Sequence, residues 1–502
     1  MIRRLLIANR GEIAVRIART CRALDIESVA VYSEPDRGAY HVRSADQAFC
    51  IGPAEAQASY LNIDALLEAA RLSGAEALHP GYGFLAESAA FARAVEAAGL
   101  IWVGPPAAAI ERLGNKLEAR ALARSAGIPV VPGFDAAGAD EASLVQAGAE
   151  LGYPLLVKAA AGGGGKGMRV VGGADELRLA IRLGRGEAQA AFGDSTLYLE
   201  RLISQPRHVE VQILGDRHGK VVALGERECS LQRRHQKIVE ESPSPAVSAE
   251  LRKQLCQAAI ELGRAAGYSS AGTVEFLLDP EGRFYFLEVN TRLQVEHPVT
   301  EWVTGLDLVA EMLQVASGAG LRSESEQIQP RGWAIECRIY AEDPEHGFAP
   351  SPGRISHLCQ PAGPGVRVDS GVESGDPISP HYDPLIAKLI VHGPDREIAR
   401  RRTLAALREY RIAGVQTVLP FLTDLLADPA FAGGRLHTGL VADFLARWGK
   451  NDGDRLEVAA LALAVSQTGS RAPAAPDGQT GPSPGPDPWV ELGGWTNGAG
   501  WP

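Results

Sequence analysis

Several classes of protein are disfavoured by what this sequence lacks. Its six cysteines are scattered without a C-x-x-C pair, so there is no zinc signature, and this usage is typical of a reduced, intracellular chain. No apolar run approaches the roughly 20 residues that span a bilayer. The start, MIRRLLIANRGE, has an apolar core too short for a signal peptide. The formal net charge of −11 argues against a surface for nucleic acid or anionic membranes. We therefore expect a cytoplasmic protein that binds neither nucleic acid nor membrane.

The chain is long enough for several domains. Its 502 residues exceed the roughly 250–300 residues at which a single core stops growing. The opening alternates apolar strands (LLIA, ESVAVYS, AEALHP, LIWVG) with helical patterns (EIAVRIARTCRAL, NIDALLEAARLSG, FARAVEAAG). This order predicts a parallel sheet with helices on its faces, closing a first domain near residue 114.

Three further regions follow in the sequence. From about 115 to 320, paired strands alternate with glycine-rich or charged loops. Residues 330–447 are strand-rich from WAIECRIYAED through AKLIVHG and then contain the helical pattern REIARRRTLAALREY. From 448 to 502 the composition becomes rich in proline, glycine and serine, which cannot bury enough apolar surface to fold. We expect this last segment to be a largely disordered linker or tail.

The most glycine-dense segment is PLLVKAAAGGGGKGMRVV. It satisfies G-x-G-x-x-G, but it continues into a strand, whereas a dinucleotide-binding loop should open a helix. It is not a Walker A loop either, because Lys166 is followed by Gly167. A strand, a glycine loop and a second strand indicate a flap whose backbone N–H groups approach phosphate, with Lys158 as a nearby point charge. A hairpin that binds no ligand is the alternative.

Alternating polar residues mark the segment EVNTRLQVEHP. If it is extended, Glu288, Asn290, Arg292, Gln294 and Glu296 share one face, which is either a solvated strand face or a site. A two-residue turn at Glu281-Gly282 in the preceding hairpin pairs Pro280 with Arg283. That register places Glu275 opposite Glu288, about 5 Å apart.

Two opposed carboxylates are unfavourable unless a cation lies between them. Hard oxygen ligands beside phosphate favour Mg²⁺ or Mn²⁺, and Asn290 adds an amide oxygen. Exposed carboxylates on an edge hairpin, or a turn of another length, are the alternatives. Arg292 to Glu296 then predict an anion site with a carboxylate as a possible base. The loop LQRRHQK, ending at Lys237, either closes over this place or is a solvated loop.

The motifs together resemble one family. The segments ANRGEIAVRI, HPGYGFLAES, KAAAGGGGKGMRVV, PRHVEVQILGD, ERECSLQRRHQK, EVNTRLQVEHPVTE and ECRIYAEDP are similar to those of the biotin carboxylase component of biotin-dependent carboxylases, from residue 1 to about 447. The resemblance implies a multidomain α/β and α+β fold. Its parts would be an N-terminal Rossmann-like (pre-ATP-grasp) domain (1–114), an ATP-grasp domain (115–320) with a glycine-rich lid at about 130–203, and a C-terminal biotin carboxylase domain (330–447).

The resemblance also implies the reaction and the partners. MgATP, with two positions for Mg²⁺ or Mn²⁺, would phosphorylate bicarbonate to carboxyphosphate, which delivers CO₂ to N1 of biotin and leaves ADP and phosphate. This is the first half-reaction of an acyl-CoA carboxylase. Biotin would be a substrate on a biotin carboxyl carrier protein or biotinyl domain, with a carboxyltransferase as a further partner. The family resemblance suggests a homodimer.

Site residues carry over from the resemblance position by position. Lys116 and Lys158 would bind ATP phosphates, with Gly164 and Gly165 in the flap. The remaining implied roles are an adenine-binding hinge (Glu200, Arg201, Leu202, Ile203), further nucleotide contacts (His208, His235), metal ligands (Glu275, Glu288, Asn290), a bicarbonate pocket (Lys237, Arg292, Gln294, Val295), the base (Glu296), the biotin enolate partner (Arg338) and a residue beside the biotin ring (Tyr82).

The sequence also departs from the family. Val418 stands where Asn is common and His437 where Asp is common, both remote from the expected site. The three methionines (Met1, Met168, Met312) are not beside a lysine, so there is no recognisable Met-Lys-Met biotin attachment site. The tail resembles the segment that enters the biotinyl region of acyl-CoA carboxylase α-subunits, and the chain ends where that region would begin.

Three rival functions are weaker. Another ATP-grasp ligase would not require RLQVEHPVTE and ECRIYAED. A nicotinamide-dependent oxidoreductase is disfavoured by the strand after the glycine loop. A non-catalytic ATP-binding module would tolerate loss of Arg292 and Glu296, which are both present.

Overall fold

The structure is a computed structural model that describes residues 2–135, 139–160, 168–321, 328 and 330–449. The chain divides into two compact units, Met1–Arg447 and Trp448–Pro502. The glycine run at 161–167 and nearly all of the expected linker at 448–502 lie outside the described residues. In the described ranges, no helix combines the length and apolar character needed to cross a membrane.

The first region contains a parallel sheet with the strand order β3-β2-β1-β4-β5, as the alternating pattern predicts. The sequence pattern missed β3, α2 and α5 but located the other strands and helices to within a few residues. The strands are β1 (Arg4–Ile7), β2 (Glu27–Ser33), β3 (Gln47–Gly52), β4 (Ala77–His79) and β5 (Ile101–Trp102). The helices are α1 (Gly11–Ala23), α2 (Tyr40–Ser44), α3 (Ile63–Ser73), α4 (Ala89–Ala97) and α5 (Ala107–Gly114), with short 3-10 turns at Glu34–Asp36 and Ala56–Ala58.

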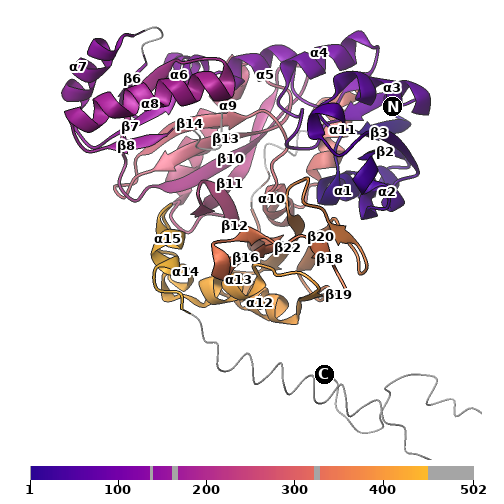
Figure 1. Cartoon of the computed structure of the whole chain (residues 1–502). Coiled ribbons are helices and arrows are strands. Elements are labelled where there is room, and N and C mark those ends of the chain that lie inside the picture. The colour runs from indigo at the N-terminus through magenta and orange to yellow at the C-terminus, as the bar shows by residue number, and fades with distance from the viewer. Residues whose placement is uncertain (1, 136–138, 161–167, 322–327, 329, 450–502) are drawn as a thin grey trace, which may run out of the picture. The chain divides into compact units, whose positions relative to one another are not determined.

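A small antiparallel sheet with the order β6-β9-β7-β8 forms within the expected lid. Its two helices lie on one face (Figure 1), because alternate residues of β7 and β9 and the apolar stripe of α8, including Leu177 and Ile181, bury one common core. The elements are β6 (Gly133–Phe134), α7 (Glu141–Leu151), β7 (Leu155–Ala159), β8 (Arg169–Val171), α8 (Ala174–Phe192) and β9 (Leu197–Arg201). Helix α6 (Lys116–Ser125) leads into this region.

The largest sheet has eight strands in the order β14-β13-β10-β11-β12-β15-β22-β20. It crosses the boundary expected near 320–330, because β12 pairs with β15 through Val239–Cys337 and Glu240–Glu336. The strands are β10 (Arg207–Gly215), β11 (Val221–Arg233), β12 (Gln236–Ser242), β13 (Ser270–Leu278), β14 (Phe284–Asn290), β15 (Trp333–Tyr340), β20 (Val366–Ser370) and β22 (Leu385–Gly393). The helices between these strands are α9 (Ala249–Ala265), α10 (His297–Thr304) and α11 (Leu308–Ala316).

The C-terminal part of the first unit adds helices and two-stranded ladders around this sheet. The helices are α12 (Arg396–Glu409), α13 (Leu419–Ala427), α14 (Pro429–Ala432) and α15 (Leu440–Leu445), with a 3-10 turn at Pro344–His346. The ladders pair β16 (Glu342–Asp343) with β17 (Ala349–Pro350), β18 (Gly353–Arg354) with β21 (Pro377–Ile378), and β19 (His357–Cys359) with β23 (Arg411–Ala413).

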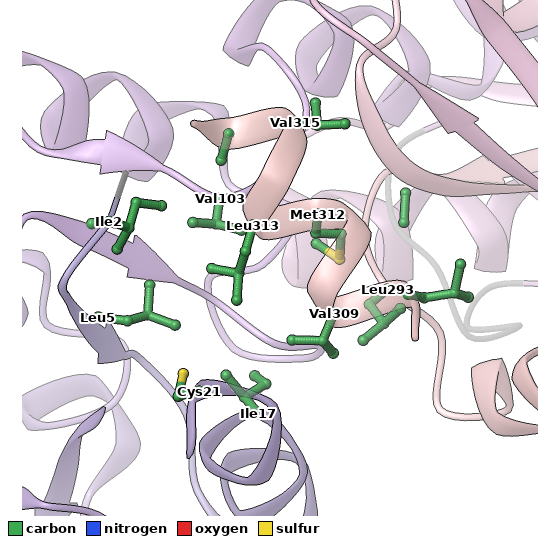
Figure 2. Packing of buried hydrophobic residues seen from close by; sticks show 14 of the residues in the cluster. Ile2, Leu5, Ile17, Cys21, Val103, Leu293, Val309, Met312, Leu313 and Val315 are labelled. Carbon is green, nitrogen blue, oxygen red and sulfur yellow. The ribbon is translucent and has the colours of Figure 1, made fainter. Parts of the chain in front are cut away.

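One apolar core joins the first region to the ATP-grasp region. Figure 2 shows Val309, Met312 and Leu313 of α11 packed toward Leu5 of β1 and Ile17 of α1. Leu293, from the polar EVNTRLQVEHP segment, belongs to the same core and is fully buried. Burial of these side chains contributes roughly 1.5–3 kcal/mol each. The core therefore fixes the loop that carries Arg292 and Gln294.

Candidate active site

A cleft of about 940 Å³ collects most of the predicted site residues. Its walls come from the loops of the first region, the lid sheet and the eight-stranded sheet. The predicted residues that line it are Tyr82, Lys116, Lys158, His208, His235, Lys237, Glu275, Glu288, Asn290, Arg292, Gln294, Val295 and Arg338. Glu296 is buried and contacts two of these residues, Lys237 and Arg338. Residues far apart in the sequence thus form one charged cavity.

A row of charged residues crosses four strands at the floor of this site. Arg227 of β11 lies opposite Glu210 of β10, Glu210 lies opposite Glu275 of β13, and Glu275 lies opposite Glu288 of β14. The Arg227 guanidinium donates to Glu210, and both side chains are buried. One end of the row is thus a balanced ion pair, whereas Glu275 and Glu288 leave two carboxylates side by side.

The opposition of Glu275 and Glu288 confirms the predicted pair, but the predicted turn is wrong. Asp279, not Pro280, bonds to Arg283 across the turn, so the connection has three residues rather than two. The register shifts again between Glu275 and Phe276, where Leu287 is the extra residue of a β-bulge. The two one-residue differences cancel, and the predicted alignment is restored at the carboxylates.

The predicted extended segment through Glu296 is also wrong. Strand β14 ends at Asn290, and 291–296 form a loop that leads into α10. The polar side chains still converge, because Arg292 donates to Asn290 Oδ1 at 3.0 Å and to Gln294 Oε1 at 2.9 Å. The burial of Leu293 on the other side of the loop holds this arrangement.

Lys237 lies at one end of the cleft, with Glu296 and Arg338, and we call this the acceptor end. Its ammonium contacts three carboxylates, Glu210, Glu275 (2.9 Å) and Glu296 (2.7 Å). Burial lowers the pKa of Lys237, but these carboxylates outweigh it and raise that pKa well above its usual value. The side chain therefore carries a fixed positive charge.

Arg338 of β15 binds the second oxygen of Glu296. Its guanidinium lies 3.0 Å from Glu296 Oε2 and also donates to Glu240 at 2.6 Å. Burial raises the pKa of Glu296, but Lys237 and Arg338 overcome it and hold that pKa well below its usual value. Burial raises the pKa of Glu240 to about 7. Glu296 is thus ionised between two cations, and Tyr82 lines the same cleft.

At the other end of the cleft lie two lysines, Lys158 from the lid sheet and Lys116 from α6. Lys158 of β7 is buried and pairs with Glu200 of β9, which also binds Arg120 of α6. Lys116 is the first residue of α6, which Asn115 caps, and it lies 3.8 Å from Glu288. A cation at a helix N-terminus is disfavoured by the helix dipole, so this placement favours an anionic ligand nearby.

The two histidines occupy different environments. His208 lies 3.0 Å from Glu275. Burial lowers the pKa of His208, but the Glu275 charge outweighs it, so the net shift is upward. His235 lines the cleft, and loss of surrounding water together with the Lys158 charge lowers its pKa.

The expected hinge residues do not line the cleft. Glu200 is buried behind Lys158, and Arg201, Leu202 and Ile203 are also absent from the lining. The flap residues Gly164 and Gly165 lie outside the described residues.

The donor set fits a hard divalent cation. Burial and the Glu275 charge both raise the pKa of Glu288, as expected for two carboxylates with too little positive charge between them. Asn290 donates to Glu275 at 2.8 Å, so its amide lies within reach of the same carboxylates. Glu275, Glu288 and Asn290 are therefore suited to hold Mg²⁺ or Mn²⁺.

Sequence reasoning missed several charged residues of the site. They are Glu12, Glu87, Glu210, Arg227, Glu240 and Lys388. Glu87 bonds to Arg292 at 3.0 Å and to the Thr291 N–H at 3.0 Å. A usable signal existed for Glu210, because a carboxylate between valines in VEVQI predicts a buried charge that needs a partner.

Comparisons with known proteins agree with this architecture. The chain matches three families, described as "Biotin carboxylase, N-terminal domain" (residues 1–110), "Carbamoyl-phosphate synthase L chain, ATP binding domain" (115–324) and "Biotin carboxylase C-terminal domain" (336–443). It is 51% identical over 439 residues to Biotin carboxylase 1 of Bacillus subtilis, covering 87% of this chain and 98% of that protein.

A longer relative and two solved structures extend the comparison. The human mitochondrial propionyl-CoA carboxylase alpha chain is 49% identical over 442 residues, and the match covers 88% of this chain but only 61% of that protein. A biotin carboxylase–β-γ-ATP complex from Campylobacter jejuni has a TM-score of 0.86 and 43% identity, covering 88% of this chain and 99% of the other.

The biotin carboxylase domain dimer of Hydrogenobacter thermophilus 2-oxoglutarate carboxylase, in complex with MgADP, ADP and bicarbonate, has a TM-score of 0.86 and 44% identity. The match covers 90% of this chain and 100% of that one. On the fold, the charged cleft and these matches, the chain belongs to the biotin carboxylase family.

Proposed function

We propose that this chain carboxylates biotin with bicarbonate and MgATP, the first half-reaction of an acyl-CoA carboxylase. The observation that carries the proposal is the ionised Glu296, held between Lys237 (2.7 Å) and Arg338 (3.0 Å). A phosphate-binding protein without acceptor chemistry needs no buried carboxylate of this kind next to its metal ligands. The neighbouring guanidinium of Arg292 completes a pocket for a planar anion.

The nucleotide end binds and orients ATP. Lys116 and Lys158 offer positive charge to the phosphates, with His208 and His235 beside them, and Glu275, Glu288 and Asn290 would hold the metal. When bound, the metal neutralises charge on the phosphate oxygens. Phosphoryl transfer depends mainly on such positioning and charge stabilisation.

Glu296 acts as the base for bicarbonate. In the free site its two cations keep its pKa low, which makes it a weak base. A bound carbonate or enolate competes for Lys237 and Arg338, so their hold on Glu296 weakens and its pKa rises. The proton passes from bicarbonate to Glu296, an oxygen of the resulting dianion bonds to the γ-phosphorus, and the bond from phosphorus to ADP breaks.

The product of that step, carboxyphosphate, must be kept from water. A closed cleft excludes solvent, which protects reactive intermediates. Carboxyphosphate releases CO₂ and phosphate, the released phosphate takes the proton from N1 of biotin, and N1 bonds to CO₂. Arg338 stabilises the enolate oxygen of biotin, and Tyr82 lies beside the ring.

The chain acts with partners in this proposal. Biotin is presented on a carrier protein or biotinyl domain, and a carboxyltransferase passes the carboxyl group on. A homodimer is supported by the dimer named for the Hydrogenobacter thermophilus relative. The three-domain division at 1–114, 115–320 and 330–447 is part of the same proposal.

The test is ADP release from MgATP and bicarbonate, with and without free biotin. We expect bicarbonate-dependent release that biotin stimulates. Equal release without bicarbonate would indicate another ATP-grasp ligase. ATP binding without release, even with an added biotinylated carrier, would indicate a binding module and overturn the proposal.

A further inference from the structure

A buried lysine that the proposed mechanism does not use contacts the loop at 291–296, which we call the acceptor loop. Lys388 is in β22, in the C-terminal region, and its side chain has no exposed surface. Burying an ammonium group is costly unless it is paired and hydrogen-bonded. The contacts of its Nζ atom therefore indicate what this position requires.

The ammonium of Lys388 contacts all three regions of the first unit. Nζ donates to the backbone carbonyl of Val295, in the acceptor loop, at 2.9 Å. It lies 3.2 Å from Glu12 Oε2 of α1 and 4.0 Å from Asp369 Oδ2 of β20. Its charge is also 5.9 Å from the ring centre of Tyr82.

These contacts differ in kind. Glu12 and Asp369 balance the charge, yet neither Glu12 oxygen has hydrogen-bond geometry to any partner in the part of the chain that the structure describes. The directional bond of Lys388 goes instead to the Val295 carbonyl. Charge balance alone would not need that bond.

The Val295 carbonyl belongs to the peptide unit that leads into Glu296. A peptide unit is planar, so fixing its carbonyl also fixes its plane and the start of the Glu296 side chain. The preceding carbonyl, of Gln294, is held by His297 through the backbone N–H (3.3 Å) and the ring Nδ1 (2.7 Å). Two successive carbonyls of this turn are therefore held by side chains, that of Gln294 by His297 and that of Val295 by Lys388. We call the Lys388 bond the clamp.

We propose that Lys388 is a positioning residue for bicarbonate and biotin chemistry, which holds the Val295–Glu296 peptide in place through its bond to the Val295 carbonyl. The inference rests on the proposed function, because it concerns the same site. It adds a device in which a side chain of the C-terminal region aligns a base carried by the ATP-grasp region.

The test compares Lys388→Met with the matched control Arg367→Met. Arg367 binds Asp369 (2.7 Å) and Glu301 (2.8 Å) in the same ionic cluster, but the structure gives it no contact with Val295. Both variants remove a positive charge from the cluster, and only Lys388→Met removes the clamp. In the Lys388 variant Asp369 still has Arg367 as its ion-pair partner, and Glu12 can take up a proton, so neither carboxylate is left as an unpaired charge.

We expect Lys388→Met to lower kcat/KM for bicarbonate and for biotin roughly 10- to 100-fold, the effect of a misplaced catalytic group. Its Kd for MgATP should match the parent value, and Arg367→Met should match the parent in all three constants. Parent-like bicarbonate and biotin kinetics in Lys388→Met would overturn the inference. So would an equal loss in Arg367→Met, since that would indicate a general effect of the cluster.

A double variant covers the case in which Lys388→Met does not fold. Glu12→Gln/Lys388→Met removes both charges and still lacks the clamp, so it should bind MgATP and show the same loss of bicarbonate and biotin kinetics. Parent-like kinetics in the double variant would contradict the inference. If the parent itself shows no biotin-stimulated ADP release, the proposed function fails; if the parent is active and the variants equal it, only the role of Lys388 fails.

Discussion

The two ends of the cleft are built differently. At the acceptor end, Lys237 binds three carboxylates and Arg338 binds two, which joins β10, β12, β13, β15 and the acceptor loop in one buried network. At the nucleotide end, Lys158 pairs with Glu200, and Lys116 is 3.8 Å from Glu288. The acceptor end is thus preorganised, whereas the nucleotide end must exchange its ion pairs for phosphate contacts.

The difference indicates where binding and chemistry are separated. Groups fixed before the substrate arrives need no reorganisation during the reaction, which is how electrostatic stabilisation acts in enzymes. Groups that change partners on binding contribute mainly to affinity. Substitutions at the acceptor end should therefore lower kcat, and substitutions at the nucleotide end should raise KM for MgATP.

The largest effect is expected for Glu296→Gln. Loss of a positioned base typically costs about 10²–10⁴-fold in rate. The amide is nearly isosteric, but its oxygen can accept from only one of Lys237 and Arg338, and it cannot take the bicarbonate proton. Bicarbonate-dependent ADP release measures the effect, with the Kd for MgATP as the control. Full retained turnover would remove Glu296 as the base.

The second-largest loss of activity is expected for Arg338→Ala. Removing one donor to a developing oxyanion costs roughly 10²–10³-fold, so carboxylation of free biotin should fall by that factor. MgATP binding should be retained, because Arg338 contacts Glu240 and Glu296 rather than the lid. Carboxybiotin formation is the readout, and a parent rate would show that Arg338 has no role in it.

Lys158→Met tests the nucleotide end. A charge-assisted hydrogen bond contributes about 1.5–3 kcal/mol, so KM for MgATP should rise about 10- to 100-fold with little change in KM for bicarbonate. Glu200 keeps Arg120 as a partner, so the lid sheet should remain folded. Steady-state kinetics with each substrate varied in turn make the check. A rise in KM for bicarbonate of equal size would mean that the two ends are not separate.

These contrasts also explain what the sequence could predict. The parallel sheet of the first region and the long helices follow from local periodicity, and the multidomain fold class is confirmed. Local pattern could also bring Glu275 and Glu288 together, although only because the three-residue turn and the bulge at Leu287 cancel. A bulge has no clear local signal, so register over a longer hairpin is not predictable in this way.

The contacts of the acceptor network could not be predicted from the sequence. Lys388 is 93 residues from Val295 in the sequence, and Glu12 belongs to another region of the chain. No period of 2 or 3.6 connects such residues, because their contacts depend on how the regions pack. The prediction of Arg292 and Glu296 assumed an extended strand, which is wrong. The two residues nevertheless reach the same cleft, because the burial of Leu293 anchors the loop that carries them.

The smallest expected effect concerns stability at the edge of the acceptor network. Burial raises the pKa of Glu12 to about 7, even though Lys388 opposes the shift. Between the usual glutamate pKa and this value the folded state holds more protons than the unfolded state, so the Glu12 contribution to stability falls as pH rises through that window. The slope is at most about 1.4 kcal/mol per pH unit.

Glu12→Gln should remove this slope. The amide cannot ionise, so the variant has neither the proton release nor the ion pair with Lys388, which forms only when Glu12 is ionised. We therefore expect the Tm difference between parent and variant to change steadily from about pH 4.5 to 7 and to level off above, when both are followed by thermal unfolding. Parallel curves across that window would mean that Glu12 is ionised throughout. The acceptor network would then be a fully charged lattice, and the contrast with the simple ion pairs of the nucleotide end would be sharper still.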